Sequence, residues 1–429
     1  MGNEGSVAKS MKHTIFEKIL LSHCDESDLK VGDIVEVAID RVMIHDFFTP
    51  FCINKFKEME FTQVINPEKI VIIYDHLIPT TFLDDCRHHK ITEEFVKEQH
   101  LTYVHRSDGV CHQLMHEQGY VKPGDIVLGT DSHTVTYGAL GALATGIGYT
   151  EMAAVLGTGK MWMKVAPTMK MVVNGTLQPG VTSKDVILHI LGDIKTDGAT
   201  YKVLEFTGST ITNMTLDSRL VLSNMSVEGG AKAGIIAPDE KTVAYLSKFY
   251  AQKEIPMIQS DADAEYARVL EYHAETIPPL VACPHNVDNV KPAMELEDVT
   301  IDQAFLGSCT NGRVEDFELA AKIVRGKKIH PNVRFIVVPA SRDVYIQAIQ
   351  KGYIAILAEA GAIISHPACG LCAGRSGGIL ENGERIISSN NRNFLGRMGG
   401  NKVEIFLGSP ATVAASSLEG KIVDPRKYL

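Results

Sequence analysis

Three cysteines of this chain lie in stretches that could bind a metal. Cys369 and Cys372 form a CxxC pair within SHPACGLCAGRSGG, and Cys309 lies in GSCTNGR. A single CxxC pair fits a redox disulfide, part of a zinc site or two ligands of an iron–sulfur cluster. The glycines that follow the pair make a redox motif at the start of a helix the weakest of these interpretations.

Zinc and iron–sulfur chemistry both remain open from the residues alone. Zinc would take a Cys₃His set in which His366 joins the three cysteines, although structural zinc usually stabilises much smaller domains. An iron–sulfur cube held by Cys309, Cys369 and Cys372 would keep one iron without a protein ligand. Such an iron can act as a Lewis acid on a substrate hydroxyl or carboxylate.

Further polar residues follow β-branched runs of the sequence. Asp75 and His76 end KIVIIYDH, Asp131 to His133 end DIVLGTDSH, and Cys309 follows a third strand-like run. Ligands of parallel α/β sheets bind beyond the carboxyl ends of the strands. We therefore expect these separate loops to converge on one site.

A basic island follows the CxxC pair in an otherwise acidic chain. The chain has 42 basic and 52 acidic side chains, a net charge of -10, which disfavours nucleic acid and anionic membranes as partners. The island consists of Arg375, Arg385, Arg392 and Arg397. Because a guanidinium group can bind a carboxylate through two hydrogen bonds, we expect this island to bind a small carboxylic acid.

The length and the alternation of elements predict several α/β units. A chain of 429 residues is long enough for about three domains. β-Branched runs alternate with helical periodicity, which is typical of α/β layers with largely parallel sheets. The proline-rich stretch 275–292 is the best linker candidate, and a softer boundary lies near Ala166. We expect three α/β/α domains over residues 1–166, 167–280 and 281–429.

No segment of the sequence predicts attachment to a membrane. No apolar run approaches the ~18 residues that cross a bilayer, and the N-terminus has no charged-then-apolar signal pattern. Met1-Gly2 with Ser6 fits a myristoylation pattern formally, which we interpret as a coincidence. We expect a cytoplasmic protein whose eight cysteines are free thiols or ligands.

Several ordered motifs together resemble the aconitase superfamily, and within it the large subunits of the 3-isopropylmalate dehydratase and homoaconitase type. The motifs are GSCTNGRVEDF, HPACGLCAG, LGTDSHTVTYGALGALATGIGYTE and NNRNFLGR. The resemblance runs from VMIHDFFTP to LGSPATVAASSLEG. It implies three aconitase-like domains around a cluster-binding cleft. It also implies a [4Fe–4S]-dependent hydro-lyase that moves a hydroxyl between adjacent carbons by removing and re-adding water.

The same resemblance implies roles for individual residues. The implied cluster ligands are Cys309, Cys369 and Cys372, with one iron not ligated by protein. The implied catalytic groups, which assist the departing hydroxyl, are Asp75, His76, His112, Asp131, His133 and Glu228. The implied neighbours of the cluster are Asn224 and Asn391. The implied substrate-binding residues are Ser132, Arg392, Arg397 and Asp46. We interpret the remaining candidate histidines as structural, namely His45, His88, His89 and His116.

The resemblance further implies a substrate class and a partner. The substrate would be a hydroxy di- or tricarboxylate: first 3-isopropylmalate, formed from 2-isopropylmalate in leucine biosynthesis, then homocitrate or homoisocitrate, then a methylated malate. Single-chain members of the superfamily continue into a fourth domain, whereas this sequence stops near the end of the third. We therefore expect a separate small subunit that carries the swivelling fourth domain and its catalytic serine. An iron-sensing RNA-binding protein and a zinc-containing binding module remain alternatives, and the net charge of -10 disfavours the former.

Overall fold

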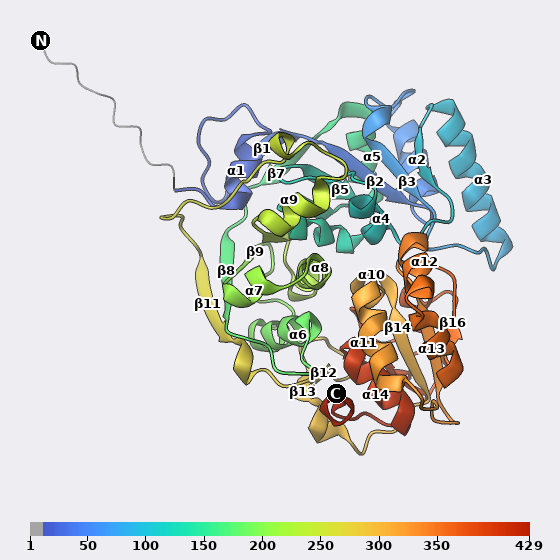
Figure 1. Cartoon of the computed structure of the whole chain (residues 1–429). Coiled ribbons are helices and arrows are strands. Elements are labelled where there is room, and N and C mark those ends of the chain that lie inside the picture. The colour runs from blue at the N-terminus through green and yellow to red at the C-terminus, as the bar shows by residue number, and fades with distance from the viewer. Residues whose placement is uncertain (1–11) are drawn as a thin grey trace, which may run out of the picture.

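The computed structural model describes residues 12–429 and shows three main sheets with their helices (Figure 1). The predicted α/β class with largely parallel sheets is confirmed. Residues 1–11, which include the myristoylation-like pattern, lie outside the described residues. Within residues 12–429 every helix is too short or too polar to cross a membrane, and the cytoplasmic location stays a prediction.

The first sheet has five parallel strands in the order β4-β3-β2-β5-β6. They are β2 (Arg41–His45), β3 (Ile70–Ile73), β4 (Tyr103–His105), β5 (Ile126–Gly129) and β6 (Leu143–Gly146). Strand β3 is buried on both faces, which explains its continuous apolar run IVII. Helices cover both faces of this sheet: α2 (Thr49–Glu58), α3 (Leu83–Glu98) and α5 (Tyr149–Thr158) on one, and α4 (Cys111–Glu117) with the 3₁₀ helix η2 (Ser132–Leu140) on the other.

The second sheet has four parallel strands in the order β10-β9-β8-β11. They are β8 (Thr168–Asn174), β9 (Val203–Thr207), β10 (Ala233–Ile236) and β11 (Arg268–His273). One face packs on α6 (Ser183–Ile194), α7 (Ser209–Asn213) and α8 (Leu216–Met225). A Cβ atom at Gly138 of η2 would lie 2.0 Å from the carbonyl oxygen of Gly234, so only glycine permits this approach of η2 to β10.

The third sheet has seven strands in the order β13-β12-β18-β17-β14-β15-β16. They are β12 (Leu280–Ala282), β13 (Val290–Pro292), β14 (Gln303–Gly307), β15 (Arg334–Val338), β16 (Ile363–Ile364), β17 (Arg385–Ser388) and β18 (Glu404–Gly408). One face is covered by α11 (Val314–Val324), α12 (Arg342–Gln350), α13 (Tyr353–Ala360) and α14 (Pro410–Glu419). The other face packs on α6 and on Leu371, Leu380 and Met398, so the second and third sheets share one core.

The prediction that residues 275–292 form a linker is wrong for part of this stretch. Strand β12 pairs antiparallel with β13 and joins the third sheet through β18. The prolines lie outside these strands or at their ends, where no ladder N–H is required. The second sheet ends at His273 and the third begins at Leu280. The division into domains at residues 166 and 280 stays a prediction.

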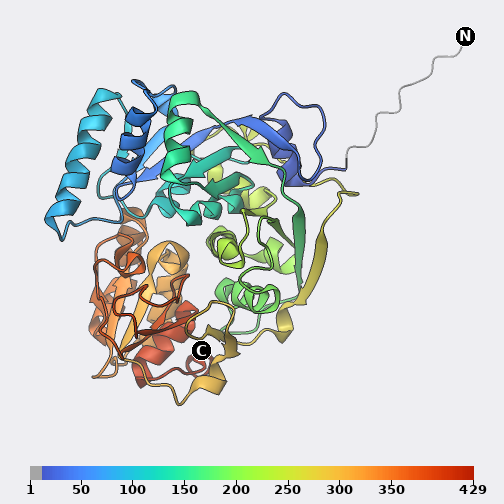
Figure 2. The same ribbon diagram turned by 180° about the vertical axis from the view of Figure 1, so that it is seen from behind.

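The three sheets lie around a common centre, as the views from the two sides show (Figures 1 and 2). Strands β1 (Ile34–Ala38) and β7 (Lys160–Lys164) form a separate antiparallel ribbon at the edge. The short helix α10 (Ser308–Asn311) of the third part contacts both α4 of the first and α8 of the second. The segment that carries Cys309 therefore lies where all three parts meet.

A fully buried lysine joins the second and third sheets at this centre. Lys184, in the first turn of α6, has no solvent exposure, and its Nζ donates to the carbonyl oxygens of Ser389 and Asn390, both at 2.7 Å. Burial lowers the pKa of Lys184 to about 7. The two hydrogen bonds suit a neutral amine, which has two N–H donors. They fix the chain just before Asn391 and Arg392.

We predict that Lys184→Met destabilises the protein by roughly 2–4 kcal/mol, because two buried carbonyl groups lose their donors. The folded-state pKa is lower than that of an unfolded lysine, so the unfolded chain binds more protons above pH 7. The stability of the wild type should therefore rise relative to the variant between about pH 7 and pH 10. Urea denaturation across this range measures both effects.

Lys202→Met is the matched control, because the Nζ of Lys202 also donates to two carbonyl oxygens, at 3.2 and 3.5 Å, but is partly exposed. It should change stability by less than about 1 kcal/mol. Equal effects of the two substitutions at all pH values would contradict the role given to Lys184.

Candidate active site

A strained turn presents Cys309 at the carboxyl end of β14. Gly307 has a φ of 152°, and a Cβ there would lie 2.3 Å from the carbonyl oxygen of Val338. Ser308 has a φ of 67°, in the left-handed region that side chains other than glycine seldom adopt. This turn places Cys309 in α10, buried at the centre of the molecule.

The CxxC pair reaches the same centre from another loop. Cys369 and Cys372 lie at and within the 3₁₀ helix η7 (Gly370–Ala373), and both are buried. The N–H of Cys369 donates to the carbonyl oxygen of Asp75 at 2.8 Å. Nη2 of Arg397 lies 3.7 Å from Sγ of Cys372. The structure thus brings together the three cysteines that the sequence singled out.

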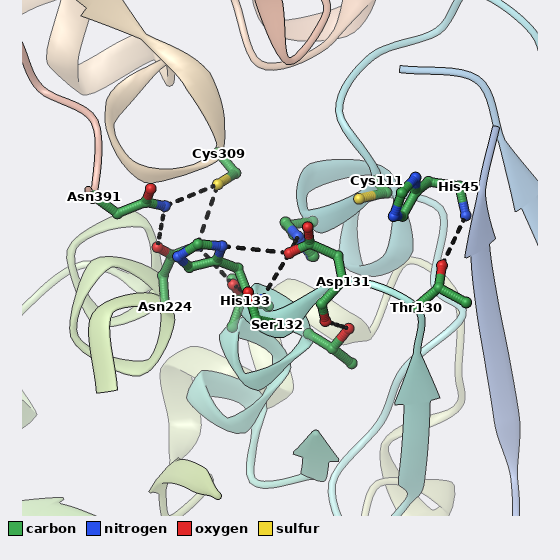
Figure 3. Close-up of polar contacts among 12 residues, drawn as sticks. His45, Cys111, Thr130, Asp131, Ser132, His133, Asn224, Cys309 and Asn391 are labelled. Carbon is green, nitrogen blue, oxygen red and sulfur yellow. Dashed lines mark hydrogen bonds and ion pairs between the residues drawn. The ribbon is translucent and has the colours of Figure 1, made fainter. Parts of the chain in front are cut away.

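Two asparagines direct amide donors at the sulfur of Cys309 (Figure 3). Nδ2 of Asn224 lies 3.3 Å and Nδ2 of Asn391 3.6 Å from this Sγ atom. Nδ2 of Asn391 also donates to Oδ1 of Asn224 at 3.1 Å, which holds both amides in place. N–H donors near sulfur favour its negatively charged form and are typical of the surroundings of a thiolate ligand.

The Cys₃His zinc site considered from the sequence is not assembled. His366 is exposed, and its Nε2 lies 3.0 Å from the carbonyl oxygen of Ile78 and its Nδ1 3.5 Å from Oγ of Ser365. A zinc ion would hold its sulfur ligands within about 4 Å of one another. Among residues 12–429, no set of three ligand atoms within 4.8 Å includes these cysteines. The three cysteines are therefore left as a donor set without the fourth ligand that the zinc interpretation requires.

A chain of acid–base contacts lies beside Cys309 (Figure 3). Oδ1 of Asp131 lies 2.8 Å from Nε2 of His112 and accepts the backbone N–H of His133 at 2.7 Å. Nε2 of His133 lies 2.8 Å from Oε1 of Glu228. Burial opposes ionisation of Asp131, but the two histidines hold its pKa well below the usual range. Burial likewise lowers the pKa of His133, but its hydrogen bonds to Asp131 and Glu228 raise it overall.

Arg392 lies in the loop after β17 and binds Glu228, the last residue of these acid–base contacts. Its Nε donates to Oε1 of Glu228 at 2.9 Å, and its Nη2 donates to Oγ of Ser132 at 2.9 Å. Although burial opposes it, His133 and Arg392 lower the pKa of Glu228. Glu228 is therefore ionised and lies between His133 and Arg392.

His76 is the histidine with the most strongly raised pKa. Its Nδ1 lies 2.6 Å from Oδ1 of the fully buried Asp75, whose Oδ2 accepts the N–H of Cys111 at 2.8 Å. Burial favours neutral His76, but the charge of Asp75 outweighs it and raises the pKa to about 9. Its Nε2 lies 3.8 Å from Oδ2 of Asp131, beyond hydrogen-bond distance. His76 can therefore offer a proton from Nε2 at neutral pH.

Asp46 was expected to bind substrate, and the structure gives it a different role. Its carboxylate is fully buried and accepts the N–H groups of His76 at 3.1 Å and Leu77 at 3.0 Å. Nε2 of His89 lies 3.1 Å from Oδ2 of Asp46. With its oxygens occupied, Asp46 fixes the turn that carries His76 and does not face the cavity.

His45 was interpreted as structural, and the structure places it at the cavity described below. Its ring stacks on that of His76, with centroids 4.0 Å apart, and neither ring nitrogen has a hydrogen-bond partner. Burial and the nearby His76 lower its pKa to about 4. The signal for His45 was present in VMIHD, a strand run that ends in polar residues like KIVIIYDH.

Some of the residues described above border an open cavity of about 460 Å³. Arg375, Arg392 and Arg397 line it together with His45, His76 and Ser132. Arg385, by contrast, does not belong to this basic island. It lies at the start of β17, where its Nε donates to Oε2 of Glu404 at 2.5 Å, whereas Asn391 and Arg392 follow the other end of the strand.

The sequence matches the aconitase family (aconitate hydratase) over residues 17–293 and 287–420. The chain belongs to the aconitase family. Curated relatives of this aconitase-family chain include two proteins named 3-isopropylmalate dehydratase large subunit. That of Methanopyrus kandleri (large subunit 1) is 46% identical over 420 residues, 98% of this chain and 100% of the relative. That of Aquifex aeolicus is 45% identical over 421 residues, 97% of each chain. Among solved structures, aconitase X of Thermococcus kodakaraensis (holo-form) matches with a TM-score of 0.49 and 13% identity over 88% of this chain and 89% of that one.

We predict that Asp75→Asn lowers the pKa of His76 from about 9 toward 6.5, because the charge that holds its proton is lost. NMR titration of histidine-labelled protein, with the signal assigned from His76→Gln, measures this shift. Asp40→Asn is the matched control, since Oδ2 of Asp40 lies 2.6 Å from Nε2 of His23, a pair away from the cavity. A His76 signal that titrates alike in the wild type and in Asp75→Asn would contradict this account.

Proposed function

We propose that this chain is the large, cluster-bearing subunit of a hydro-lyase of the 3-isopropylmalate dehydratase type. The observation that carries the proposal is the convergence of Cys309, Cys369 and Cys372 beside Asn224 and Asn391 in one buried place. Full-length relatives that bear this name support it.

We propose a [4Fe–4S] cluster on the three cysteines, with one iron that no protein group ligates. Such a cluster with its three thiolate ligands is negatively charged. The N–H donors of Asn224 and Asn391 near Cys309 and the guanidinium of Arg397 near Cys372 suit this charge. The engagement of His366 with Ile78 and Ser365, away from the cysteines, supports a cluster over a Cys₃His zinc site. When bound, the cluster would supply a Lewis acid.

The side chains of the cavity would then bind the acid and move a proton. In the dehydration step a C–H bond and the adjacent C–O bond break, a C=C bond forms, and water leaves. Nε2 of His76 would give the departing hydroxyl its proton, while Asp75 stabilises the imidazolium. His112, Asp131, His133 and Glu228 would relay protons around the hydroxyl. Arg392, Arg397 and Ser132 would bind the carboxylates.

We propose that the enzyme isomerises 2-isopropylmalate to 3-isopropylmalate in leucine biosynthesis by dehydration and rehydration. The names of the relatives support this choice over homoisocitrate or a methylated malate. The same relatives are named as large subunits, which supports a separate small subunit. We propose that this partner carries the fourth domain and the serine that removes the proton from carbon, and closes over the cavity.

We predict that protein purified without oxygen contains iron and sulfide and is bleached by air. Cys309→Ser should abolish the cluster, because it removes one of three ligands, as iron and sulfide analysis and the visible absorption spectrum will show. Cys283→Ser, which replaces another buried cysteine, should retain it. Stoichiometric zinc without sulfide would instead support the zinc-containing alternative.

We predict that the cluster-loaded chain alone has little activity and that a small subunit activates it saturably near an equimolar ratio. Activation by far more than tenfold is expected, because the partner would supply the base and exclude water. Titration of the partner in a 3-isopropylmalate dehydration assay measures this. Full turnover by the isolated chain would show that the base belongs to this chain.

A further inference from the structure

A second cavity lies next to that of the candidate active site. It has a volume of about 260 Å³ and lies between β6, the last strand of the first sheet, and β7 of the antiparallel ribbon. Leu143, Thr145 and Gly146 line it from β6, and residues 161–164 line it from β7. None of these side chains takes part in the proposed reaction.

Most of the side chains around this second cavity are apolar or aromatic. Phe16 of α1 (Ile15–Leu21) is buried there, whereas Met161 and Met163 are partly buried. Trp162, the only tryptophan in the sequence, is 60% exposed. A concave surface that is mainly apolar and has a few polar groups is typical of sites for small ligands. A ligand with a hydrocarbon or aromatic body would cover the exposed indole and remove apolar surface from water.

The polar groups of this cavity include two lysines beside one tyrosine. Nζ of Lys164 lies 5.8 Å and Nζ of Lys232 5.1 Å from the centre of the Tyr201 ring. The N–H of Lys232 donates to the carbonyl oxygen of Lys202 at 2.8 Å, which holds Lys232 next to the loop of Tyr201. Among residues 12–429, neither ammonium group forms an ion pair or a hydrogen bond. Both therefore retain N–H donors for an anionic ligand.

One acidic residue, Glu151, also lines the cavity, and its carboxylate is turned toward its own helix. A Cβ at Gly148, which caps the start of α5, would lie 2.5 Å from Oε2 of Glu151. The N–H groups in the first turn of a helix carry partial positive charge, which attracts this carboxylate. With two lysines and one glutamate, the lining keeps an excess of positive charge.

The second cavity and the active-site cavity share two residues. Gly146 and Ile147 line both. A Cβ at Gly146 would lie 2.5 Å from the carbonyl oxygen of Asp131 and 2.8 Å from Cα of Ser132. The backbone at Gly146 is therefore packed directly against the turn that presents Asp131 and Ser132 to the active site. A ligand that touches Gly146 and Ile147 in the second cavity touches a wall of the active site.

We propose that the second cavity binds a small amphipathic carboxylate, which acts as an effector of the active site. The apolar body of the ligand would lie against Trp162, and its carboxylate would lie beside Lys164 and Lys232. Two ligands that touch the same residues change each other's affinity by the same factor. The binding of the carboxylate does not depend on the proposed function, whereas its effect on turnover rests on it.

The fluorescence of Trp162 measures binding directly, because no other tryptophan of the chain contributes to the signal. The full chain is titrated with 3-phenylpropanoate, with its neutral amide and with acetate. We expect a saturable change with 3-phenylpropanoate at a Kd about 5- to 20-fold below that of the amide, because only the acid pairs with the lysines. Acetate should bind much more weakly than either, because it has almost no apolar surface.

The double variant Lys164→Gln, Lys232→Gln should bind the acid and the amide alike. Both lysines are exposed, so the substitutions should not disturb folding. Lys160→Gln is the matched control and should keep the preference for the acid. Lys160 lies on the same strand, but its Nζ pairs with Oε1 of Glu36 at 3.5 Å and it does not line the cavity.

The effect on the active site is measured as dehydration of 3-isopropylmalate by the cluster-loaded complex with its small subunit. We expect 3-phenylpropanoate to change KM or kcat to a plateau that persists at saturating substrate. The double lysine variant should lose this effect and keep its basal activity. If no hydroxy acid is dehydrated but the lysine-dependent binding is found, the proposed function fails and the binding site stands.

Other results would overturn the proposal. Equal affinity of the wild type for the acid and the amide would show that the lysines do not select an anion. Strict competition between 3-phenylpropanoate and 3-isopropylmalate would place the probe in the active-site cavity. Release of the probe from the chain by the small subunit would show that the second cavity receives the partner and not a small carboxylate.

Discussion

The site depends on two buried basic side chains, those of Arg313 and Lys184, whose N–H donors are directed to backbone carbonyl groups. Arg313, almost fully buried, donates from Nη2 to the carbonyl oxygen of Cys309 at 2.8 Å and from Nη1 to that of Thr310 at 2.9 Å. Its Nε donates to Oε1 of Gln113 in α4 at 2.9 Å, so it ties the cysteine loop to the first sheet. Lys184 does the same for the loop before Asn391 from the second sheet. Buried carbonyl groups without donors would cost about 1–3 kcal/mol each, so these contacts both stabilise the loops and fix the distances between the three parts.

The buried histidines of the site are of two kinds, which differ in whether a carboxylate lies within hydrogen-bond distance of the ring. His76 and His133 each have a carboxylate within hydrogen-bond distance, and the pKa of each is raised although burial alone would lower it. His45 has no hydrogen-bonded carboxylate, and its pKa falls to about 4. A protonated and a neutral imidazole are therefore stacked with their centroids 4.0 Å apart at neutral pH. This pair can offer both a proton donor and a proton acceptor in the same cavity.

Much of this arrangement could be predicted from the sequence, because strand ends in parallel sheets meet at one edge and the motifs are spaced along those ends. Asp75, Asp131 and Cys309 follow strands, and the structure brings their loops together. The features that the sequence did not reveal depend on neighbouring strands or on strand direction. The run VMIHD places His45 at a strand end, but its stacking on His76 depends on the adjacency of β2 and β3, which no local pattern reveals. Arg385 is close in sequence to Arg392, but the two residues lie at opposite ends of the four-residue strand β17, and only Arg392 lies at the cavity.

The stacked histidines continue into a row of aromatic rings that includes Phe48 and Tyr149. The rings of Tyr149, Phe48, His45 and His76 follow one another with centroid distances of 6.2, 5.1 and 4.0 Å. A ligand that displaced water from the space beside Phe48 would desolvate the same side of His45 and favour its neutral imidazole. Exclusion of water would also strengthen the interaction of His76 with Asp75, because the local dielectric constant falls. Removal of water from this part of the cavity would therefore stabilise the two different protonation states of the stacked histidines.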